Sequence, residues 1–363
     1  MNELEILLRE RIRSDGPVTF AEYQDAALYH PEFGYYAGDQ RSGWRGHFLT
    51  SAELDPAFGA LWAVGFRRVW GWLNRPETFE LIEVGPGEGG FANSILGVVE
   101  GDFADALTYR LVERVPALAE RQMSLLSTYD NVVWSSSIEE LSRVPHGAVM
   151  ANEVLDNLPV NLLEVRGGEF VELYVQASDS GFEFVAGPLS SSLVSRLLDG
   201  AGYEPNEGQR LEVAAEAVAF VRSCATAVER GSVFLVDYGL TWRELAERRS
   251  GTLLSYSDTG TDDLILDRPG DKDITSHANW DVAAATLRSA GFEVSGPTPQ
   301  RTVLGELGLA DLDESLAERQ RNLTAEGRGA EALRALSRRQ ALSVLSDPHG
   351  LGGLDVLIGR RGI

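Results

Sequence analysis

The sequence predicts an α/β protein built around a mostly parallel β-sheet. Between residues 79 and 152, short apolar runs alternate with helical patterns, which is typical of strand–helix units joined by right-handed crossovers. The first of these runs, Phe79–Val84, leads directly into a bend rich in glycine. A later group of apolar runs is separated by short turns and has no helices between them, so a smaller antiparallel part is also expected.

Helices are expected before this region, up to about residue 75. An amphipathic stripe is formed by Leu4, Leu7, Leu8 and Ile12. Thr19 and Glu22 have the spacing of a capping box, which predicts a short helix over Phe20–Leu28. A longer helix is expected at about Ala57–Trp70.

The central region supplies the strands of the parallel sheet and the helices between them. Strands are expected at Phe79–Val84, Tyr109–Glu113, Asn131–Trp134 and Ala148–Asn152, with helices at about Glu88–Val99 and Ala117–Leu126. An antiparallel meander is then expected at Val160–Val165, Phe170–Val175 and Phe182–Val185.

The last part of the chain returns to longer elements. The predicted order is a helix at Val213–Glu229, a strand at Val233–Gly239, a loop region around Thr252–Lys272, a helix at Trp280–Ala290, a strand at Phe292–Ser295, a polar helical stretch at about Leu312–Leu345 and a strand at Leu354–Gly359.

Composition limits the function. The chain has 363 residues, of which 44% are hydrophobic, so it can bury a sizeable core. Its formal net charge of −23 repels phosphate backbones, so we expect no nucleic-acid partner. A basic substrate is compatible with this charge.

The chain has one cysteine, Cys224, which lies in an apolar helical pattern and is expected in the core. The five histidines do not have the spacing of metal ligands, so no metal is expected. The acidic start lacks the apolar segment of a signal peptide, and no run approaches the roughly 20 apolar residues of a membrane span. We therefore expect a cytoplasmic protein without a membrane partner.

The glycine-rich bend is the strongest candidate for a ligand site. Glu83 ends the first strand, and Gly85, Pro86, Gly87 and Gly89 follow it. Glycine permits positive φ and lets a ligand approach the backbone closely. In an open α/β sheet, such a bend binds a nucleotide-like cofactor beyond the strand ends. The carboxylate of Glu83 suits a ligand with an ammonium group and fits a pyrophosphate poorly.

The glycine spacing allows two interpretations. Gly85, Gly87 and Gly90 satisfy the dinucleotide pattern G-x-G-x-x-G, which alone is a weak signal. Glu83 with Gly85, Gly87 and Gly89 gives E-x-G-x-G-x-G, which resembles motif I of class I S-adenosylmethionine (SAM) methyltransferases. Glu113 ends the second strand, 24 residues after Gly89, where an acid can accept both hydroxyls of a ribose.

A polar loop follows the fourth predicted strand. It contains Asn152, Glu153, Asp156 and Asn157, all before Pro159. Two carboxylates and two amides are costly to bury without partners, so their presence at a strand end favours a function. The alternative is a turn with helix-cap residues. We favour a functional role for Asn152 and Glu153, and more weakly for Asp156.

Other candidates lie in four separate segments. Asp237 and Tyr238 end a later strand and either line the crevice or cap the strand. His277 follows Asp273 in a short polar segment, and a lone histidine is more often structural. The remaining candidates are Tyr35 and Tyr36 in an aromatic loop, and Thr50 and Ser51, for which helix capping is the alternative role.

Together these motifs resemble one family. The resemblance covers nearly the whole chain and is carried by Gly16–Tyr23, Ala27–Pro31, Gly34–Tyr36, Gly46–Glu53, Glu83–Gly89, Leu111–Glu113, Asn152–Pro159, Val236–Gly239, Gly251–Leu253 and Pro269–His277. On these segments the chain resembles the MidA / NDUFAF-seven family of class I SAM-dependent methyltransferases. Studied mitochondrial members of that family are protein arginine methyltransferases that support assembly of respiratory complex I.

The resemblance implies a fold and a cofactor. The fold is a Rossmann-like, seven-stranded, mostly parallel sheet. Residues 76–160 and 230–363 would form the SAM-binding domain, 1–75 a helical segment covering the active site, and 160–230 an inserted substrate or dimer region. The cofactor would be S-adenosyl-L-methionine, released as S-adenosyl-L-homocysteine.

The resemblance also implies residue roles. The cofactor would be held by Glu83, Gly85, Pro86, Gly87, Gly89, Glu113, Thr50, Ser51 and Asn152. The acceptor arginine would meet Tyr35, Tyr36, Asp237, Tyr238 and His277. Our own hypothesis is that Glu153 and Asp156, helped by Asn152, orient its guanidinium, because two acids lie where a strand should meet the crevice. His47, Ala52 and Val115 depart from the family pattern. These departures surround the expected acceptor side, so they bear on the substrate more than on SAM.

Three alternatives remain open at this stage. The first is a small-molecule O- or N-methyltransferase on the same fold, because the site and not the fold decides the substrate. The second is a non-catalytic assembly factor. The third is a nucleotide-dependent oxidoreductase that uses the G-x-G-x-x-G pattern. The meander at Val160–Val185 offers either a substrate surface or a homodimer surface.

Overall fold

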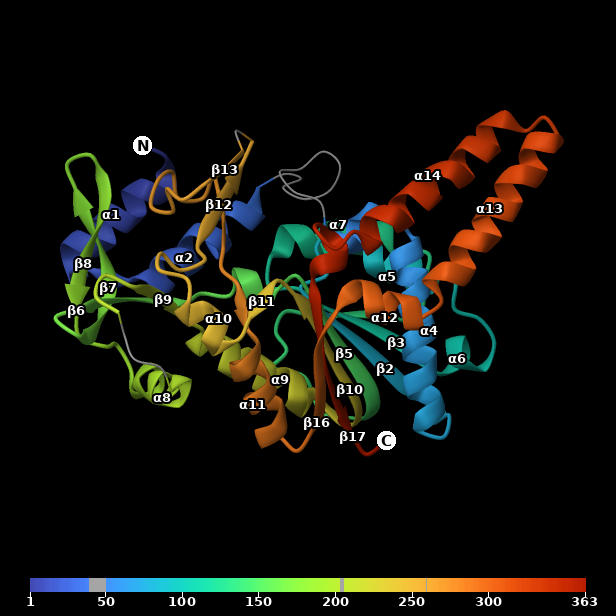
Figure 1. The fold of residues 1–363 in the computed structure, drawn as a ribbon, viewed down its shortest axis with the longest axis horizontal. Coiled ribbons are helices and arrows are strands. Elements are labelled where there is room, and N and C mark those ends of the chain that lie inside the picture. The colour runs from blue at the N-terminus through green and yellow to red at the C-terminus, as the bar shows by residue number, and fades with distance from the viewer. Residues whose placement is uncertain (39–49, 203–205, 259) are drawn as a thin grey trace.

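A seven-stranded sheet forms the centre of the molecule in the computed structural model, which describes residues 1–38, 50–202, 206–258 and 260–363 (Figure 1). Its strands are β2 (Phe79–Val84), β3 (Leu107–Val112), β4 (Val132–Ser135), β5 (Val144–Asn152), β10 (Val228–Asp237), β16 (Glu293–Pro299) and β17 (Asp355–Arg361). Their order is β16-β17-β10-β5-β2-β3-β4. Only β17 runs against its neighbours in this sheet. The predicted seven-stranded, mostly parallel sheet is therefore confirmed.

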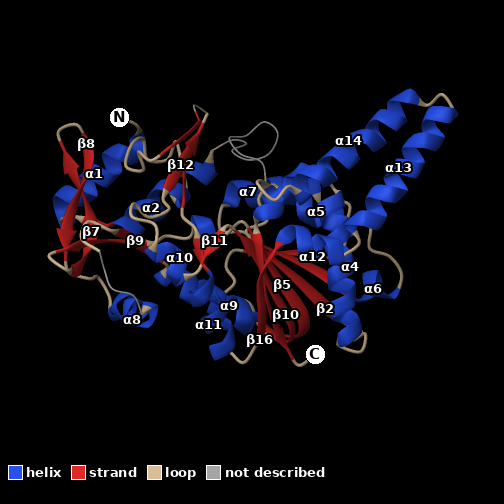
Figure 2. Cartoon of the chain, viewed as in Figure 1, coloured by secondary structure: helices blue, strands red, loops and turns tan. Residues whose placement is uncertain are grey.

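Helices cover both faces of this sheet, as Figure 2 shows. One face carries α4 (Ala57–Trp72), α5 (Gly90–Leu96), α6 (Asp102–Ala106), α12 (Gln300–Glu306) and η3 (Leu351–Gly353), together with the inner ends of α13 (Leu309–Ala325) and α14 (Gly329–Ser346). The other face carries α9 (Ala215–Ala227) and α11 (Trp280–Ser289), and α7 (Pro116–Leu125) joins β3 to β4. Because helices cover both faces, β2 is buried along nearly its whole length. Cys224 lies in the α9 face of the core, as predicted.

A second, antiparallel sheet lies at one end of the molecule (Figure 1). Its strands are β1 (Val18–Thr19), β6 (Asn161–Arg166), β7 (Glu169–Ser178), β8 (Gly181–Gly187) and β9 (Arg210–Val213), with α1 (Glu3–Asp15), α2 (Phe20–Tyr29) and α8 (Ser192–Ala201) beside them. The capping box of Thr19 and Glu22 is present at the start of α2. Of the predicted stripe on α1, Leu7 faces solvent and the other three residues are buried.

Short elements connect the two sheets. They are η1 (Tyr35–Ala37), α3 (Ser51–Leu54), η2 (Leu155–Asn157), β11 (Gly239–Leu240), α10 (Trp242–Ala246), β12 (Leu254–Ser257), β13 (Gly260–Asp262), β14 (Asp273–Thr275) and β15 (Ala278–Asn279). The predicted loop at Thr252–Lys272 was wrong in part, because β12 and β13 form a small sheet with β14. These strands bury serines, Ser255 and Ser257, on their inner side, so the sequence carries no apolar alternation.

Three helix predictions also differ from the structure. Val213 belongs to β9, and the helix predicted from it begins at Ala215. The helix after the glycine bend is shorter than predicted and covers Gly90–Leu96. The polar stretch at Leu312–Leu345 is two helices separated by a break at Gly327, whose φ is 74°. These two helices form a hairpin that projects from the molecule at the end opposite the antiparallel sheet (Figure 1).

The division into domains stays a prediction. The contacts place α9, which was assigned to the inserted part, against the main sheet. They also place β1, from the N-terminal segment, in the antiparallel sheet beside β7. Within the described ranges, no helix combines the length and apolarity that crossing a bilayer requires.

Candidate active site

A cavity of about 860 Å³ lies at the carboxyl ends of β2, β3 and β5. Residues of α2 and η1 from the N-terminal segment line it as well, as do residues around β12 and β14. Ligand pockets in proteins are typically about 300–1,000 Å³, and open α/β sheets bind ligands at this edge. The cavity therefore has the size and the position of a ligand site.

The glycine bend forms one wall of the cavity. Gly85, Gly87 and Gly89 have φ values of 67°, 54° and 85°, which side chains rarely adopt. A Cβ added at Gly85 would lie 2.8 Å from Cγ2 of Val154. Gly85, Pro86 and Gly87 all line the cavity. Because Gly85 and Gly87 have no side chains, they expose their backbone to it.

Glu83 lies at the end of β2, just before the bend, and is 4% exposed. Burial raises the pKa of its carboxyl to about 8, although the hydroxyl of Tyr109 donates to Oε2 at 2.6 Å. No arginine or lysine of the described residues forms an ion pair with it. A positively charged ligand group would compensate this buried acid.

Glu113 follows β3 and also lines the cavity. Burial raises its pKa to about 7. Its Oε1 accepts the backbone N–H of Val115 at 2.8 Å, and its Oε2 accepts from Nε2 of Gln122 at 3.2 Å. The same Nε2 donates to the carbonyl of Gly87 at 2.7 Å, so Gln122 ties Glu113 to the glycine bend.

The polar loop after β5 brings further acids to the cavity. Glu153 has a φ of 53°, an uncommon conformation for a residue with a side chain. Its Oε1 accepts from the backbone N–H of Ser51 and from Nδ2 of Asn152, each at 3.0 Å. Burial raises the pKa of Glu153 to about 8. Oδ1 of Asn152 is buried without a hydrogen-bond partner.

Asp237, at the end of β10, holds this loop in place. Its Oδ2 accepts the backbone N–H groups of Val154, Leu155 and Asp156 at 3.1, 2.8 and 3.2 Å. Its Oδ1 accepts the N–H of Tyr238 at 2.7 Å. The carboxylate is fully buried and is not among the residues that line the cavity. Asp237 therefore acts on the loop backbone and does not face the cavity.

Asp156 faces the cavity with an unused acceptor. The residue is 8% exposed, and its Oδ1 is buried without a partner. Burial raises its pKa well above the ordinary range, and the charges of Asp237, Asp273 and Glu153 raise it further. An unpaired buried carboxylate oxygen is costly, so a ligand donor is the simplest partner for it.

Asp273, the first residue of β14, lies on the same side of the cavity. Its Oδ1 accepts from Nδ2 of Asn157 at 2.8 Å and from the hydroxyl of Tyr36 at 3.3 Å. The ring of Tyr36 stacks on Tyr29, with centroids 5.5 Å apart. Burial raises the pKa of Asp273 to about 7. The side chains that hydrogen-bond to Asp273, those of Asn157 and Tyr36, are therefore both neutral.

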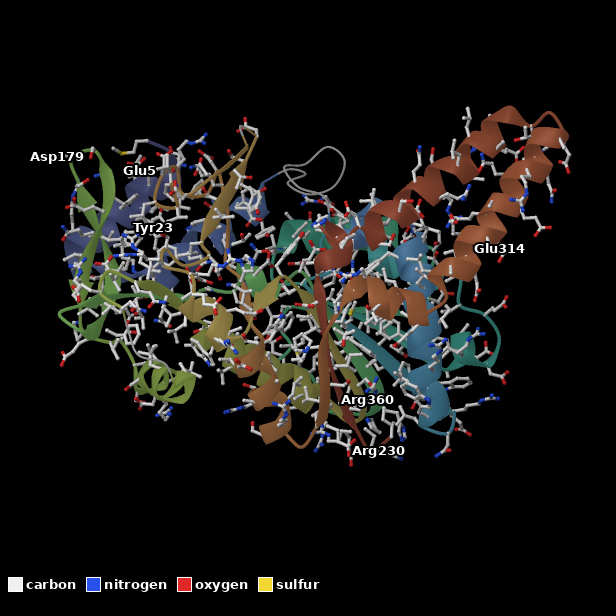
Figure 3. All side chains as sticks on the ribbon, in the orientation of Figure 1. Glu5, Tyr23, Asp179, Arg230, Glu314 and Arg360 are labelled. Carbon is white, nitrogen blue, oxygen red and sulfur yellow. The ribbon has the colours of Figure 1, made fainter. Side chains whose placement is uncertain are left out.

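The charge around the cavity is strongly negative. Its lining carboxylates are Glu22, Asp25, Glu53, Glu83, Glu88, Glu113, Glu139, Glu153, Asp156, Glu216 and Asp273. The lining arginines are Arg11, Arg114 and Arg121, which pair with Glu22, Asp25 and Glu88 respectively. Figure 3 places Arg230 and Arg360 at the opposite edge of the main sheet. The geometry thus suits a cationic ligand.

Comparison with known proteins identifies the family. A family model described as "Putative S-adenosyl-L-methionine-dependent methyltransferase" matches residues 61–298. The chain belongs to this family. Of the two cofactors that the glycine spacing left open, the family uses SAM.

Relatives and solved structures agree with this methyltransferase family. The mitochondrial protein arginine methyltransferase NDUFAF7 of Danio rerio is 29% identical over 337 residues, which are 83% of this chain and 76% of the relative. Its Drosophila melanogaster homolog is 28% identical over 344 residues, 85% of this chain and 76% of the homolog. A crystal structure of a Burkholderia thailandensis protein bound to S-adenosyl-homocysteine is 28% identical, with a TM-score of 0.86, and the match covers 99% of this chain and 92% of that one.

The cavity of this methyltransferase fits SAM. The cofactor carries an ammonium and a sulfonium. The cavity offers the buried carboxyl of Glu83, which has no ion-pair partner among the described residues, beside Gly85 and Gly87, which have no side chains. Oδ1 of Asn152 provides a further acceptor without a partner. Among the described residues, no group of histidines, cysteines and acids could hold a metal ion.

Most residues singled out from the sequence line the cavity of the methyltransferase. They are Thr50, Glu83, Gly85, Pro86, Gly87, Glu113, Asn152, Glu153, Asp156, Tyr36, Tyr238 and His277. Tyr238 is 40% exposed. Burial lowers the pKa of His277, so this histidine is neutral near pH 7. Thr50 is the N-cap residue of α3, with no capping bond from its side chain.

Ser51, Tyr35, Gly89 and Asp237 do not belong to the described lining. Ser51 supplies the N–H that binds Glu153, and its Oγ accepts from Gln300 at 2.9 Å. Tyr35 is buried in the N-terminal core, where its ring meets that of Tyr36 edge-on. Of the departures from the family pattern, Val115 and Ala52 lie at the cavity, and His47 lies outside the described residues.

Sequence reasoning gave no role to Asp273, although it lies four residues before the candidate His277. The signal that could have found it is the position of an acid at the start of a short strand. That strand, β14, is recognisable only through its pairing with β12. Tyr29 and Gln122 were missed for a similar reason, because their bonds to Asn157 and Gly87 join segments that are far apart in the chain.

Proposed function

We propose that this methyltransferase transfers the methyl group of SAM to an arginine guanidinium of a protein or peptide. The observation that carries the proposal is the unpaired Oδ1 of Asp156, which lines a cavity where neither Asp156 nor Asp273 has an ion-pair partner among the described residues. A guanidinium offers five N–H donors and a permanent positive charge. The mitochondrial relatives named as protein arginine methyltransferases support the same assignment.

The cofactor would be held by the first two strand ends. Glu83 would pair with the ammonium of the amino-acid part, and Glu113 would accept the ribose hydroxyls. Gly85, Pro86 and Gly87 would let the cofactor lie against the backbone, with Thr50 and Asn152 on the other side of the cavity. When bound, SAM supplies a methyl group made electrophilic by the adjacent sulfonium.

The acceptor needs help because a protonated guanidinium is a poor nucleophile. Its pKa lies above about 12, so it arrives charged. Carboxylates that accept N–H bonds from two of its nitrogens draw the charge toward themselves and leave electron density on the third. Glu153 and Asp156 are suited to this task, because Asp156 has an unused oxygen and Glu153 is fixed by Ser51 and Asn152.

The reaction also releases one proton. A new N–C bond forms at the methyl carbon, the C–S bond breaks with its electron pair on sulfur, and the attacking nitrogen loses a proton. Burial raises the pKa of Glu153 to about 8 in the ligand-free protein, and once the bound guanidinium holds it ionised, Glu153 can accept that proton. The methylated guanidinium then keeps its single positive charge.

The acceptor class can be tested with labelled SAM. We expect label to enter a peptide containing arginine and not the same peptides with lysine or citrulline in its place, because lysine lacks the planar guanidinium and citrulline lacks the charge. Glu153→Gln should reduce transfer about 100-fold or more while S-adenosyl-homocysteine still binds. Glu169→Gln, an exposed change on β7, is the control.

The alternatives give different results in the same assay. A small-molecule methyltransferase would label a metabolite extract and leave arginine peptides unlabelled. A non-catalytic assembly factor would bind SAM and label neither. Either result would contradict the proposal. The cytoplasmic location and a homodimer stay predictions.

A further inference from the structure

The cavity lining includes two carboxyl groups with different surroundings. Asp156 and Asp273 both line it, and each contributes to the negative potential at Tyr29, Tyr36 and Tyr256. Asp156 comes from η2 after β5, whereas Asp273 comes from β14, more than 100 residues later in the chain. A backbone bond from the N–H of Ser276 to the carbonyl of Asp156, 2.8 Å long, joins these two segments.

No described cation compensates this pair. None of the ion pairs among the described residues includes either acid, and the neighbouring Lys272 turns its Nζ to Asp262, at 2.8 Å. The groups that donate to Asp273 are neutral: Nδ2 of Asn157 and the hydroxyl of Tyr36. Within the described chain the pair therefore lacks a countercharge that would favour the ionised form of both carboxyls, and a bound cation could supply it.

A network of hydrogen bonds fixes the position of the Asp273 side chain. The hydroxyl of Tyr36 lies 3.0 Å from Oδ1 of Asn157, and Nδ2 of Asn157 donates to Asp273. The hydroxyl of Tyr29 in turn donates to the carbonyl of Asn157 at 3.2 Å. This network joins α2, η1, η2 and β14. It therefore fixes the carboxylate of Asp273 relative to the polar loop that follows β5.

We propose that Asp273, positioned by Asn157 and Tyr36, is a further carboxylate that binds the acceptor guanidinium, beside Asp156 and Glu153. This inference rests on the proposed function and adds a residue that sets substrate specificity. A planar guanidinium can engage two carboxylates along different edges, whereas a lysine ammonium is a point charge without that geometry. Two acids on separate segments thus explain a preference for arginine over lysine.

The test uses methylguanidinium chloride as a probe that requires no knowledge of the natural substrate. It is titrated by calorimetry into protein saturated with S-adenosyl-homocysteine, at constant ionic strength. We expect wild-type protein to bind it and Asp273→Asn to bind it at least tenfold more weakly. Asp271→Asn, a change of an exposed acid on the same segment, should bind it as the wild type does.

Retained affinity for S-adenosyl-homocysteine shows that each variant is folded. Should Asp273→Asn lose that affinity, Tyr36→Phe replaces it, with an expected weakening of about threefold for methylguanidinium. The affinity of the wild type should also rise with pH through about 7, as Asp273 ionises, and Asp273→Asn should flatten this dependence. A purely structural role of Asp273 would not produce the pH effect.

Two results would overturn the inference: no binding of methylguanidinium by the wild type, or equal affinity in the wild type and in Asp273→Asn or its substitute. The transfer assay separates this failure from that of the proposed function. If the protein methylates arginine peptides and the variant binds methylguanidinium as well as the wild type does, only the proposed role of Asp273 is wrong. If methylguanidinium binding depends on Asp273 but arginine peptides are not methylated, the proposed function is wrong instead.

Discussion

Glu83 carries a carboxyl whose ionisation depends on a ligand. In the ligand-free protein burial raises its pKa to about 8, and of the residues that the structure describes only Tyr109 hydrogen-bonds to its side chain. The charged form is the one that pairs with an ammonium. Binding of a cationic ligand should therefore expel a proton from this group below about pH 8.

The affinity for S-adenosyl-homocysteine should consequently rise as the pH increases from 6 to 8. Glu83→Gln should weaken binding at pH 8 about tenfold or more, because it removes a charge-assisted hydrogen bond, and should make the pH dependence shallower. Calorimetry at several pH values measures both effects. Glu80→Gln, on the same strand but paired with Arg110 outside the cavity, is the control. An unchanged slope in Glu83→Gln would contradict this account of the cofactor site.

Asp237 is an acid at a strand end whose side chain accepts hydrogen bonds from backbone N–H groups. Four backbone N–H groups bond to its two oxygens. Asp237→Asn leaves one oxygen to accept these bonds, so we expect the free energy of unfolding to fall by about 1–3 kcal/mol at pH 8. Urea unfolding of the ligand-free protein measures the change. Equal unfolding midpoints for the variant and the wild type would argue against this role.

Helix α2 connects the N-terminal segment to the cavity through one buried side chain. Nε2 of Gln24 donates to the carbonyl of Ile274 at 3.2 Å, and its Oε1 accepts the N–H of Val160 at 3.0 Å. Ile274 follows Asp273 on β14, and Val160 follows the polar loop. Gln24 therefore holds together the two segments that carry the proposed guanidinium site.

Replacing Gln24 by alanine should lower the free energy of unfolding by about 1–3 kcal/mol, because two buried backbone groups lose their partner. It should also raise KM for an arginine peptide while the affinity for S-adenosyl-homocysteine stays within about twofold. Steady-state kinetics and urea unfolding test these expectations. Gln176→Ala, which removes an exposed bond to Glu183, is the control. A Gln24→Ala variant with wild-type stability and KM would show that the link is unimportant.

Local patterns allowed the helices and the main strands to be predicted. The capping box at Thr19 and the apolar run Phe79–Val84 each involve residues close in sequence, and both elements occur where they were expected. The small sheet of β12, β13 and β14 was missed because its stability depends on pairing between segments and on buried serines. Asp273 was missed with it.

The site residues also could be predicted where the signal was local in the sequence, and were missed where it depended on distant residues. Glu83 and Glu153 could be found because Glu83 lies at the end of a predicted strand and Glu153 directly after one. The backbone role of Asp237 could not be seen, because its partners in the polar loop after β5 precede it by about 80 residues. The direction of β17 likewise required the structure.

The whole molecule combines a net charge of −23 with several buried acids. Burial raises the pKa to about 8 for Glu83 and Glu153, and to about 7 for Glu113, Asp237 and Asp273. Unfolded, these groups have pKa values near 4. Between these values the folded state binds more protons than the unfolded state, so the free energy of unfolding falls as the pH rises from about 4.5 to 8.

The ligand-free protein should therefore unfold at a lower urea concentration at pH 8 than at pH 6. Added salt should restore part of the difference by screening the negative charges. Urea titrations at the two pH values, with and without 0.5 M sodium chloride, measure these effects. A midpoint that rises with pH would contradict the view that the buried acids lack compensating charge.

The most direct measurement of the central claim is a crystal structure with S-adenosyl-homocysteine and an arginine peptide bound together. We expect the cofactor product to lie against Gly85 and Gly87, and the guanidinium to be bonded to Asp156 and Asp273 near Glu153, with one nitrogen facing the sulfur. A peptide bound elsewhere, or a cavity filled by side chains of the protein itself, would contradict it.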